Sequence, residues 1–260
     1  MTYGSVSRGF KSGGFNQRRE RVGLDGEFGE ETATSFELGV KGPFFAGALY
    51  YVDYDDFQTQ SFDGTAIRVT NAGALESYGG ELEVMFPVKE NLIVGTALGY
   101  NKASYADFKN GPCTIEAAFI DYYITQGNDR GSPGVNANCV TDLTGAPLDN
   151  APEWTVSTFA HFNKDLTDDL NLAVLLHHSY TDDFFLEQTL DSRLVNDEVN
   201  LIDLSVTLAH EKKGWEAVLW GKNLLDEGYY NVGFVIPAAS GYAGVVAPDL
   251  TYGATLRWKY

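Results

Sequence analysis

The sequence predicts an all-β protein made of antiparallel up-and-down strands that cross a membrane as part of a transmembrane β-barrel. Its 28 Gly, 15 Tyr, 16 Phe and 4 Trp stand beside only 2 Met, a composition that favours strands and turns over helices. From Thr34 onward, segments of about ten residues alternate between apolar and polar side chains, as strands with two different faces do. The links between these segments are short and long in turn.

The alternating segments predict ten strands, an even number as in bacterial barrels. The last segment alternates most cleanly, with Gly253, Thr255, Arg257 and Lys259 opposite an apolar face made by Tyr252, Ala254, Leu256, Trp258 and Tyr260. The predicted strands lie at about 1–10, 33–42, 46–60, 67–87, 92–105, 152–163, 170–181, 199–210, 215–223 and 250–260.

The order of the links favours a membrane barrel over a soluble sandwich, although a sandwich would alternate as well. The short links lie at 42–44, 88–91, 163–169 and 211–214, and the long ones at 11–32, 106–151, 182–198 and 227–249. Every second link of an up-and-down sheet lies on the same side, so all long links are expected at one end. Outer-membrane barrels have short periplasmic turns and long extracellular loops. Aromatic residues near the predicted strand ends fit an interfacial girdle.

The net charge, the lack of a long apolar run and the first residues narrow the classes of function that the protein can have. With 18 basic and 36 acidic residues, the net charge of −18 repels phosphate backbones and argues against nucleic-acid binding. No apolar run approaches the roughly 18 residues of a transmembrane helix, but alternating barrel strands would not produce one. The first residues lack a basic segment followed by an apolar one, so we expect either a cytoplasmic protein or one whose beginning lies outside this sequence.

The chain has two cysteines, Cys113 and Cys139, in one long polar segment. In an oxidising compartment they are expected to form a disulfide worth roughly 3 to 4 kcal/mol, and two unpaired thiols are the alternative.

Three groups of residues suggest chemistry, and each has a simpler explanation. The glycines around Lys11 do not follow the spacing of a phosphate-binding loop. His177 and His178 near Asp182 and Asp183 are strand neighbours that point to opposite faces, so only one can serve any single site. The carboxylates of Asp53, Asp55 and Asp56 are expected in a hydrated lumen or at a loop base.

No catalytic residue, metal site or cofactor is therefore predicted. The aromatic residues of the long links could contact a ligand from outside or pack within the loops, and both readings stay open for Phe184, Phe185, Tyr229, Tyr230, Phe234 and Tyr242.

Several segments resemble the barrels of TonB-dependent receptors. Residues 3–16 (YGSVSRGFKSGGFN) resemble a strand-and-loop signature of that family, 31–41 (ETATSFELGVK) is similar to its next strand, and 220–230 (WGKNLLDEGYY) resembles the segment after the penultimate strand. The residues that carry the resemblance are Gly9, Phe10, Lys11, Gly13, Gly14, Phe15, Asn16, Glu37, Gly39, Lys41, Asn223, Leu224, Asp226 and Tyr229. The last strand resembles the family's closing strand, which the barrel-assembly machinery reads.

The resemblance covers essentially all 260 residues but only part of the family's architecture. It implies the C-terminal portion, or the last ten strands, of a barrel of about 22 strands, without the plug domain. It further implies a bacterial outer-membrane location among lipid, energised uptake of a siderophore-iron complex or similar nutrient, and coupling to the TonB complex through an N-terminal part missing here. A truncated gene, a split reading frame or an excised fragment would explain the length. The alternative is a small closed barrel that acts as a porin or as an omptin-like protease, for which His177 or His178 with Asp182 is the candidate group.

Overall fold

The computed structural model describes residues 1–16, 26–62, 67–126, 139–236 and 241–258. A ten-stranded antiparallel sheet dominates it, in the order β1-β4-β5-β8-β9-β12-β13-β16-β17-β20. Each strand of this sheet therefore pairs with the sheet strands that come just before and just after it in the chain. This up-and-down order confirms the predicted fold class. The strands are β1 (Thr2–Lys11), β4 (Glu31–Lys41), β5 (Phe45–Asp55), β8 (Ala74–Lys89), β9 (Leu92–Asp107), β12 (Trp154–Thr167), β13 (Leu170–Thr181), β16 (Val199–His210), β17 (Trp215–Lys222) and β20 (Thr251–Trp258).

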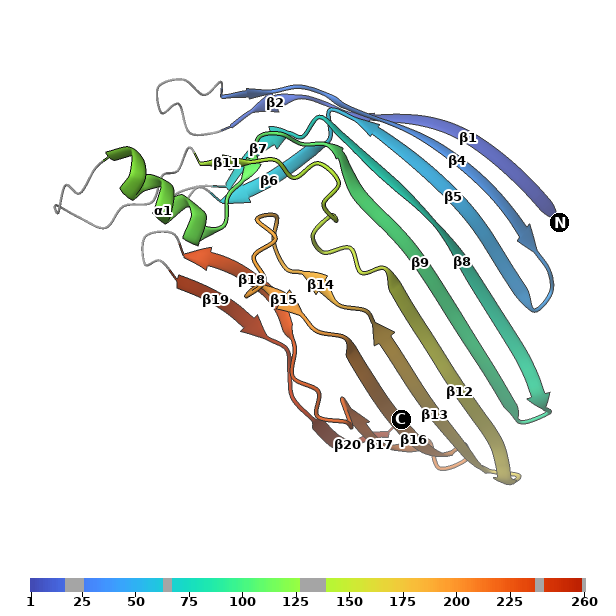
Figure 1. The fold of residues 1–260 in the computed structure, drawn as a ribbon. Coiled ribbons are helices and arrows are strands. Elements are labelled where there is room, and N and C mark those ends of the chain that lie inside the picture. Colours follow the sequence, from blue (N-terminus) through green and yellow to red (C-terminus); the bar gives the residue numbers. More distant parts are fainter. Residues whose placement is uncertain (17–25, 63–66, 127–138, 237–240, 259–260) are drawn as a thin grey trace.

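All long links leave the same end of the sheet, and both chain termini lie at the opposite end (Figure 1). The short turns at that opposite end are residues 42–44, 90–91, 168–169 and 211–214. The long links carry the remaining elements: β2 (Gly14–Phe15), β3 (Glu27–Phe28), β6 (Gln58–Phe62), β7 (Ile67–Asn71), β10 (Gly111–Pro112), α1 (Ile115–Gln126), β11 (Val140–Thr141), β14 (Phe184–Phe185), β15 (Val195–Asn196), β18 (Tyr230–Ile236) and β19 (Gly241–Val246).

Two predicted strands were wrong in extent. The segments 46–60 and 67–87 each divide, because β5 ends at Asp55 and β8 begins at Ala74. Between them β6 and β7 form a separate two-stranded hairpin, which is a long link that the sequence pattern did not reveal. The break falls at Asp56, whose φ of 53° is not that of an extended strand residue. Backbone hydrogen bonds from Asp56 to Gly73 and from Ala72 to Phe57 close the base of the hairpin.

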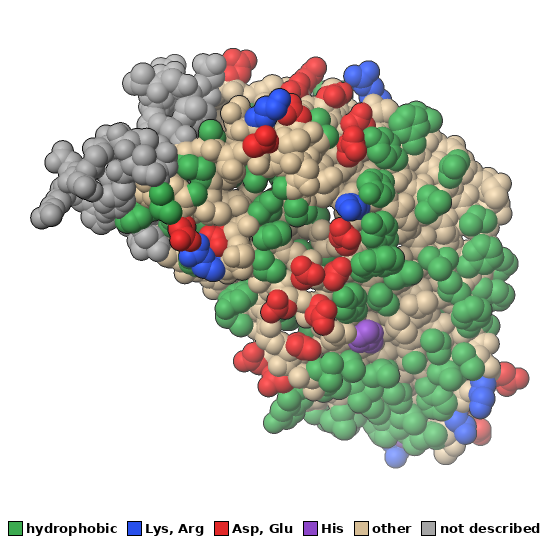
Figure 2. Space-filling model, in the orientation of Figure 1, with side chains coloured by type: hydrophobic (Ala, Val, Ile, Leu, Met, Phe, Trp, Pro, Cys, Tyr) green, Lys and Arg blue, Asp and Glu red, His purple; other side chains and the backbone are tan. Residues whose placement is uncertain are grey.

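The sheet has one apolar and one polar face. In the register of β4 and β5, Leu38 lies opposite Leu49 and Glu37 lies opposite Tyr50. The apolar face is open in this chain, with Leu38 and Leu49 both 68% exposed, and it is the face that a barrel turns toward lipid. On the face shown in Figure 2, apolar side chains gather toward the short turns, and acidic side chains form a band nearer the long links.

The closing strand β20 follows the predicted alternation. Tyr252, Ala254 and Leu256 lie opposite Gly221, Leu219 and Ala217 of β17, on the apolar face, and Trp258 lies opposite Trp215. Tyr260 lies outside the described residues.

The buried core lies among the long links and not within the sheet, because the sheet is a single layer. Its main cluster is Ala72, Leu75, Tyr105, Phe108 and Leu143, where β8 and β9 join the links. Within the described residues, no helix is long and apolar enough to cross a membrane.

Candidate functional site

The five long links form one connected layer, which we call the loop layer. It consists of loop 1 (residues 12–30), loop 2 (56–73), loop 3 (108–153), loop 4 (182–198) and loop 5 (223–250). Function in such barrels resides in loops held by a rigid sheet. We therefore describe where the residues singled out in the sequence lie in this layer and what they contact.

Asn16 joins loop 1 to loop 2. Its side-chain Nδ2 donates to the carbonyl of Val69 at 2.9 Å, and its Oδ1 accepts from the Val69 amide at 2.8 Å. This pair of bonds imitates one rung of a β-ladder and so extends the β6–β7 hairpin sideways. Gly13 has no room for a side chain, since a Cβ there would lie 2.5 Å from the carbonyl oxygen of Phe28, and a Cβ on Gly14 would meet the Phe28 ring at 2.8 Å.

Gln58 makes the second joint between the same loops, although no sequence signal singled it out. It is buried, and its Nε2 donates to the carbonyls of Ser12 at 3.0 Å and Gly29 at 2.9 Å. Its amide N–H donates to Glu31 Oε2 at 2.7 Å. A lone glutamine has no periodicity or spacing, so only the fold reveals this role.

Glu37, Gly39 and Lys41 form a cradle for the Tyr3 side chain on the polar face. The Tyr3 hydroxyl donates to Glu37 Oε1 at 2.5 Å, and Lys41 Nζ lies 5.4 Å from the centre of the Tyr3 ring. A Cβ on Gly39 would lie 2.3 Å from the same ring, so the absence of a side chain makes the cradle possible.

The remaining residues of the first signature have separate places. Gly9 has open space around it, Phe10 is exposed on the apolar face, and the Lys11 carbonyl accepts from Gln58 Nε2 at 3.4 Å. Phe15 lies in β2 and is also exposed. The signature is therefore distributed over several contacts and does not form one pocket.

Asn223 fixes the base of loop 5. Its φ is 51°, its side chain is buried, and its Nδ2 donates to the carbonyls of Glu227 at 2.9 Å and Pro248 at 3.3 Å. Its Oδ1 accepts from the Glu227 amide at 2.9 Å. Asp226, also at a positive φ of 56°, accepts from the amide of Leu250 at 2.8 Å, so both ends of loop 5 are tied together.

Leu224 and Tyr229 complete this segment. Leu224 packs over Gly221, where a Cβ would lie 2.6 Å from its Cδ2. Tyr229 lines a cavity of about 680 Å³, together with Trp220, Lys222 and Arg257. The ring of Trp220 lies close over Gly253 and its Nε1 donates to Thr255 Oγ1 at 3.4 Å.

Loop 4 is the centre of the layer because it contacts loops 2, 3 and 5. Gln188 Nε2 donates to Thr59 Oγ1 of loop 2. The Asn150 amide of loop 3 donates to the Phe185 carbonyl at 2.8 Å. Asn196 forms a pair of bonds with the backbone of Tyr230 in loop 5, at 2.7 and 2.9 Å.

These contacts divide the loop aromatics between the two readings of the sequence. Phe184 and Phe185 lie in the β14–β15 pair and are half-buried, which is loop self-packing. Tyr230 and Phe234 on β18 stay exposed, at 46% and 42%, and remain candidates for contact with a ligand.

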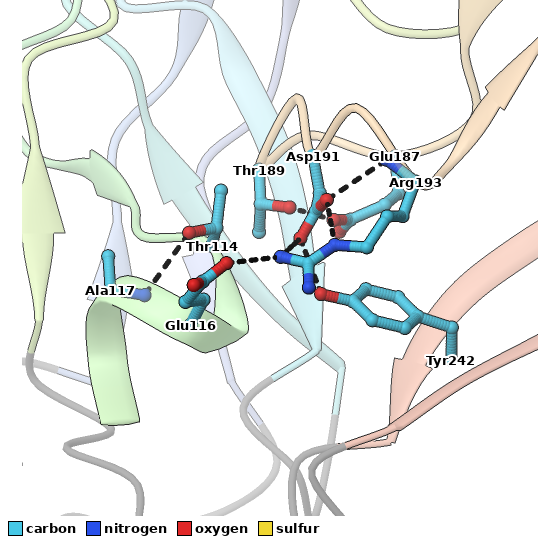
Figure 3. Close-up of polar contacts among 8 residues, drawn as sticks. All are labelled: Thr114, Glu116, Ala117, Glu187, Thr189, Asp191, Arg193 and Tyr242. Atoms are coloured by element: carbon cyan, nitrogen blue, oxygen red, sulfur yellow. Dashed lines mark hydrogen bonds and ion pairs between the residues drawn. The ribbon is translucent and has the colours of Figure 1, made fainter. Parts of the chain in front are cut away.

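A cluster around Arg193 links three loops (Figure 3). Arg193 Nε lies 2.9 Å from Asp191 Oδ1, its Nη2 lies 2.8 Å from Glu116 Oε2, and its guanidinium lies 4.8 Å from the centre of the Tyr242 ring. The Tyr242 hydroxyl donates to Asp191 Oδ2 at 2.7 Å. Burial, aided by that hydrogen bond, raises the pKa of Tyr242 to about 12.

Three buried or half-buried acids of loops 3 and 4 differ in the direction of their pKa shifts. Burial alone would raise the pKa of Asp191, but hydrogen bonds from Arg193 and Tyr242 outweigh it and lower that pKa below its ordinary value. Burial raises the pKa of Asp149, and the same cause raises the pKa of Glu187. Asp191 therefore stabilises the loops when ionised, whereas Asp149 and Glu187 destabilise them when ionised.

These shifts predict that the stability of the loop layer passes through a maximum at mildly acidic pH. As pH falls from neutral, Asp149 and Glu187 take up protons more readily in the folded than in the unfolded chain, so stability rises until about pH 4. Below that, protonation of Asp191 removes its stabilisation. Amide exchange of loops 3 and 4, corrected for intrinsic rates, measures the profile. Asp149→Asn with Glu187→Gln should abolish the rise, and an unchanged profile in that variant would contradict the assignment.

The residues considered for catalysis do not come together. His177 Nε2 is paired with Ser157 Oγ at 2.9 Å, and His178 Nε2 with Asn200 Oδ1 at 3.2 Å, on opposite faces. Asp182 accepts from the Tyr180 hydroxyl at 3.0 Å. Asp53 and Asp55 share the face of Leu49, so they point away from the lumen. Within the described ranges, no group of three or more His, Cys, Asp or Glu is placed to hold a metal.

The two cysteines are joined by a disulfide, with the Cα atoms 5.7 Å apart. It lies directly beside the β10–β11 pair in loop 3.

A single up-and-down sheet with an open apolar face and all long loops at one end defines an outer-membrane β-barrel wall. The sequence matches the family model of the TonB dependent receptor-like β-barrel over residues 1–224, so the chain belongs to that family. Proteins of this family lie in the bacterial outer membrane, and so does this chain. None of the curated proteins compared with the chain is a significant match in sequence.

Solved receptors share the fold. The ferric yersiniabactin uptake receptor FyuA of Yersinia pestis is 18% identical with a TM-score of 0.72, covering 100% of this chain and 35% of the receptor. The siderophore receptor PiuA of Acinetobacter baumannii is 13% identical with a TM-score of 0.66, covering 98% and 33%. The copper transporter OprC is 12% identical with a TM-score of 0.64, covering 100% and 37%.

At these identities the likeness shows the fold alone. The chain spans about a third of the length of the solved receptors that it matches. The family and these structures are of transport receptors and not of enzymes.

Proposed function

We propose that the chain supplies part of the barrel wall and the outer loops of a receptor for energised uptake of a small nutrient, such as an iron chelate. The observation that carries the proposal is the loop layer, in which five long loops at one end of the sheet are held together by hydrogen bonds between loops. A layer of this kind presents fixed side chains to a ligand and leaves the opposite end free for short turns. Uptake would require the TonB energy-transducing complex as partner.

An iron-siderophore complex is the ligand class we favour. One solved receptor of the same fold is described as a siderophore receptor and another as a ferric yersiniabactin uptake receptor, which supports this choice. The copper transporter among them keeps a copper ligand as the principal alternative. The exposed rings of Tyr230 and Phe234 are our candidates for ligand contact.

Uptake in cells tests the proposal. The gene that encodes the chain is deleted in its source bacterium, and entry of iron-55 as several chelates, of copper and of a vitamin is measured with and without the TonB complex. We expect uptake of one chelate to fall to background in the deletion strain and in a strain that lacks the TonB complex. Uptake in the deletion strain should return when the intact gene is supplied. Loss of copper uptake alone would identify copper, and not an iron chelate, as the ligand. Unchanged uptake of every compound tested would overturn the proposal.

A passive porin or an omptin-like protease is the other reading. No described contact assembles His177 or His178 with Asp182, so we do not propose catalysis. A porin would lose small-solute flux in the deletion strain independently of TonB, and the same uptake measurements detect that outcome.

We also propose that β20 is the strand that the barrel-assembly machinery reads. Leu256 and Trp258 are 61% and 58% exposed on the apolar face at the edge of the sheet. Replacing both by Asn should remove roughly 1.5 to 3 kcal/mol each of favourable transfer from water into lipid and lower the fraction of heat-modifiable barrel in the outer membrane. Thr255→Ser, on the polar face, is the matched control. Equal assembly of the control and the double variant would contradict the role of this face.

A further inference from the structure

Helix α1 is carried on a fixed neck. The paired strands β10 and β11 bring residues 111–112 beside 140–141, and the disulfide joins Cys113 to Cys139 at the next position. Thr114 then starts the helix, since its Oγ1 accepts from the Ala117 amide at 3.3 Å. The neck therefore determines where α1 begins and leaves its orientation to contacts beyond the neck.

One such contact is made by Glu116, in the first turn of α1, with Arg193 of loop 4. The Arg193 side chain is 49% exposed and that of Glu116 65%, and the Nη2 to Oε2 distance is 2.8 Å. Solvent screens such a pair, so it is weak by itself. It can position α1 because other residues hold the Arg193 guanidinium in place.

Arg193 is fixed from its other side by Asp191 and Tyr242. The Asp191 carboxylate is only 2% exposed and accepts from Arg193 Nε, from Arg193 Nη2 and from the Arg193 amide. It also accepts from the Tyr242 hydroxyl, and the Tyr242 ring lies under the guanidinium. The same planar group thus contacts α1 of loop 3, its own loop 4 and β19 of loop 5 (Figure 3).

The hairpin β18–β19 has further anchors on loop 4. A Cβ on Gly233 would lie 2.8 Å from Leu186 Cδ1 and 3.2 Å from Leu194 Cδ2, so β18 packs closely there. Asn196 pairs with the Tyr230 backbone at the root of the hairpin. A change in the hairpin is therefore transmitted to loop 4, and Arg193 is the group through which it would reach α1.

We propose that Arg193 is a positioning residue that couples helix α1 to the hairpin β18–β19, so that displacement of either one loosens the other. The coupling is a property of the loop layer and holds whatever ligand the receptor takes. A ligand that contacts only the hairpin would then change the order of α1. Arg193 fits this role better than lysine because its planar group contacts Asp191, Glu116 and Tyr242 at the same time.

Amide exchange by mass spectrometry on the intact receptor in detergent tests the coupling. Tyr242→Ala cuts the hairpin side, and Glu116→Gln cuts the helix side without changing the size of the side chain. With Arg193 present, we expect Tyr242→Ala to speed the exchange of α1 by a factor of about three, and Glu116→Gln to do the same for β18–β19. In an Arg193→Ala background, neither substitution should change the other element further.

Two controls keep the test decisive. Lys212→Ala removes an ion pair with Asp169 at the short-turn end, and should leave α1 and the hairpin unchanged. Arg193→Lys keeps the charge and gives a folded variant if Arg193→Ala fails to assemble; it should lose most of the coupling. The coupling is disproved if Tyr242→Ala leaves α1 exchange unchanged with Arg193 present, or changes it equally without Arg193. That outcome would not bear on the proposed uptake function, which the deletion strain tests separately.

Discussion

Removing the disulfide, by Cys113→Ala with Cys139→Ala, is expected to lower the stability of loop 3 by roughly 3 to 4 kcal/mol. The bond links cysteines that are 26 positions apart in the sequence, and so it restricts the conformations of the segment when loop 3 opens. Without the bond, the open form regains this conformational entropy and becomes more favourable. The neck pairs Gly111 with Thr141 and Pro112 with Val140, and two pairs are too few to keep the segment closed alone. We expect α1 and the neck to exchange amides far faster, while the sheet stays unchanged.

The measurement is amide exchange of the intact receptor, with the reduced wild type as a second route to the same state. Reduction and the double substitution should give the same pattern, since both remove only the covalent bond. Unchanged protection of α1 in both would show that packing of Ile115 and Ala118, which are buried, is sufficient. A loss of protection in the sheet would show that loop 3 supports the barrel wall, against our expectation.

Asn223→Ala is expected to destabilise loop 5 by about 2 to 4 kcal/mol. The change removes the side-chain bonds to Glu227 and Pro248 and places alanine at a φ of 51°. The carbonyl of Pro248 and the amide of Glu227 would then lack these partners. The rate of proteolysis within loop 5 and amide exchange of β18–β19 measure the effect.

Asn223→Gly separates the two causes, because glycine adopts the positive φ freely and still lacks the side-chain bonds. We expect it to be less harmful than alanine by about 1 kcal/mol. Asn171→Ala is a matched control: it removes two exposed side-chain bonds, to Asn163 and Asp165, at the short-turn end. Equal effects of alanine and glycine at position 223 would show that backbone strain plays no part.

Most of the sheet was predictable because its signal is local. Period-2 alternation of side chains needs only the chain itself, and it placed eight of the ten strands within a few residues of the observed ends. The order of short and long links then fixed which ends of the strands lie together. The two strands whose extent was wrong meet the hairpin β6–β7, where the alternation continues through a break that only the left-handed residue Asp56 marks.

The candidate site was predictable only in its outline. The family resemblance marked Gly13 and Asn223 as signature residues, but it did not predict that Gly13 lies against Phe28 or that Asn223 holds the base of loop 5. Their partners were not predictable, since Asn16 bonds Val69 across 53 positions of sequence and Gln188 reaches Thr59 across 129.

By itself, the sequence determined the all-β class, the up-and-down order, the apolar face and the side on which the loops lie, because alternation and link length are properties of neighbouring residues. The tertiary structure alone decided that the five loops form one layer, that Gln58 and Arg193 are among the residues that join them, and that Asp53 and Asp55 face away from the lumen. These outcomes depend on strand register and on contacts between distant loops, which no local pattern specifies.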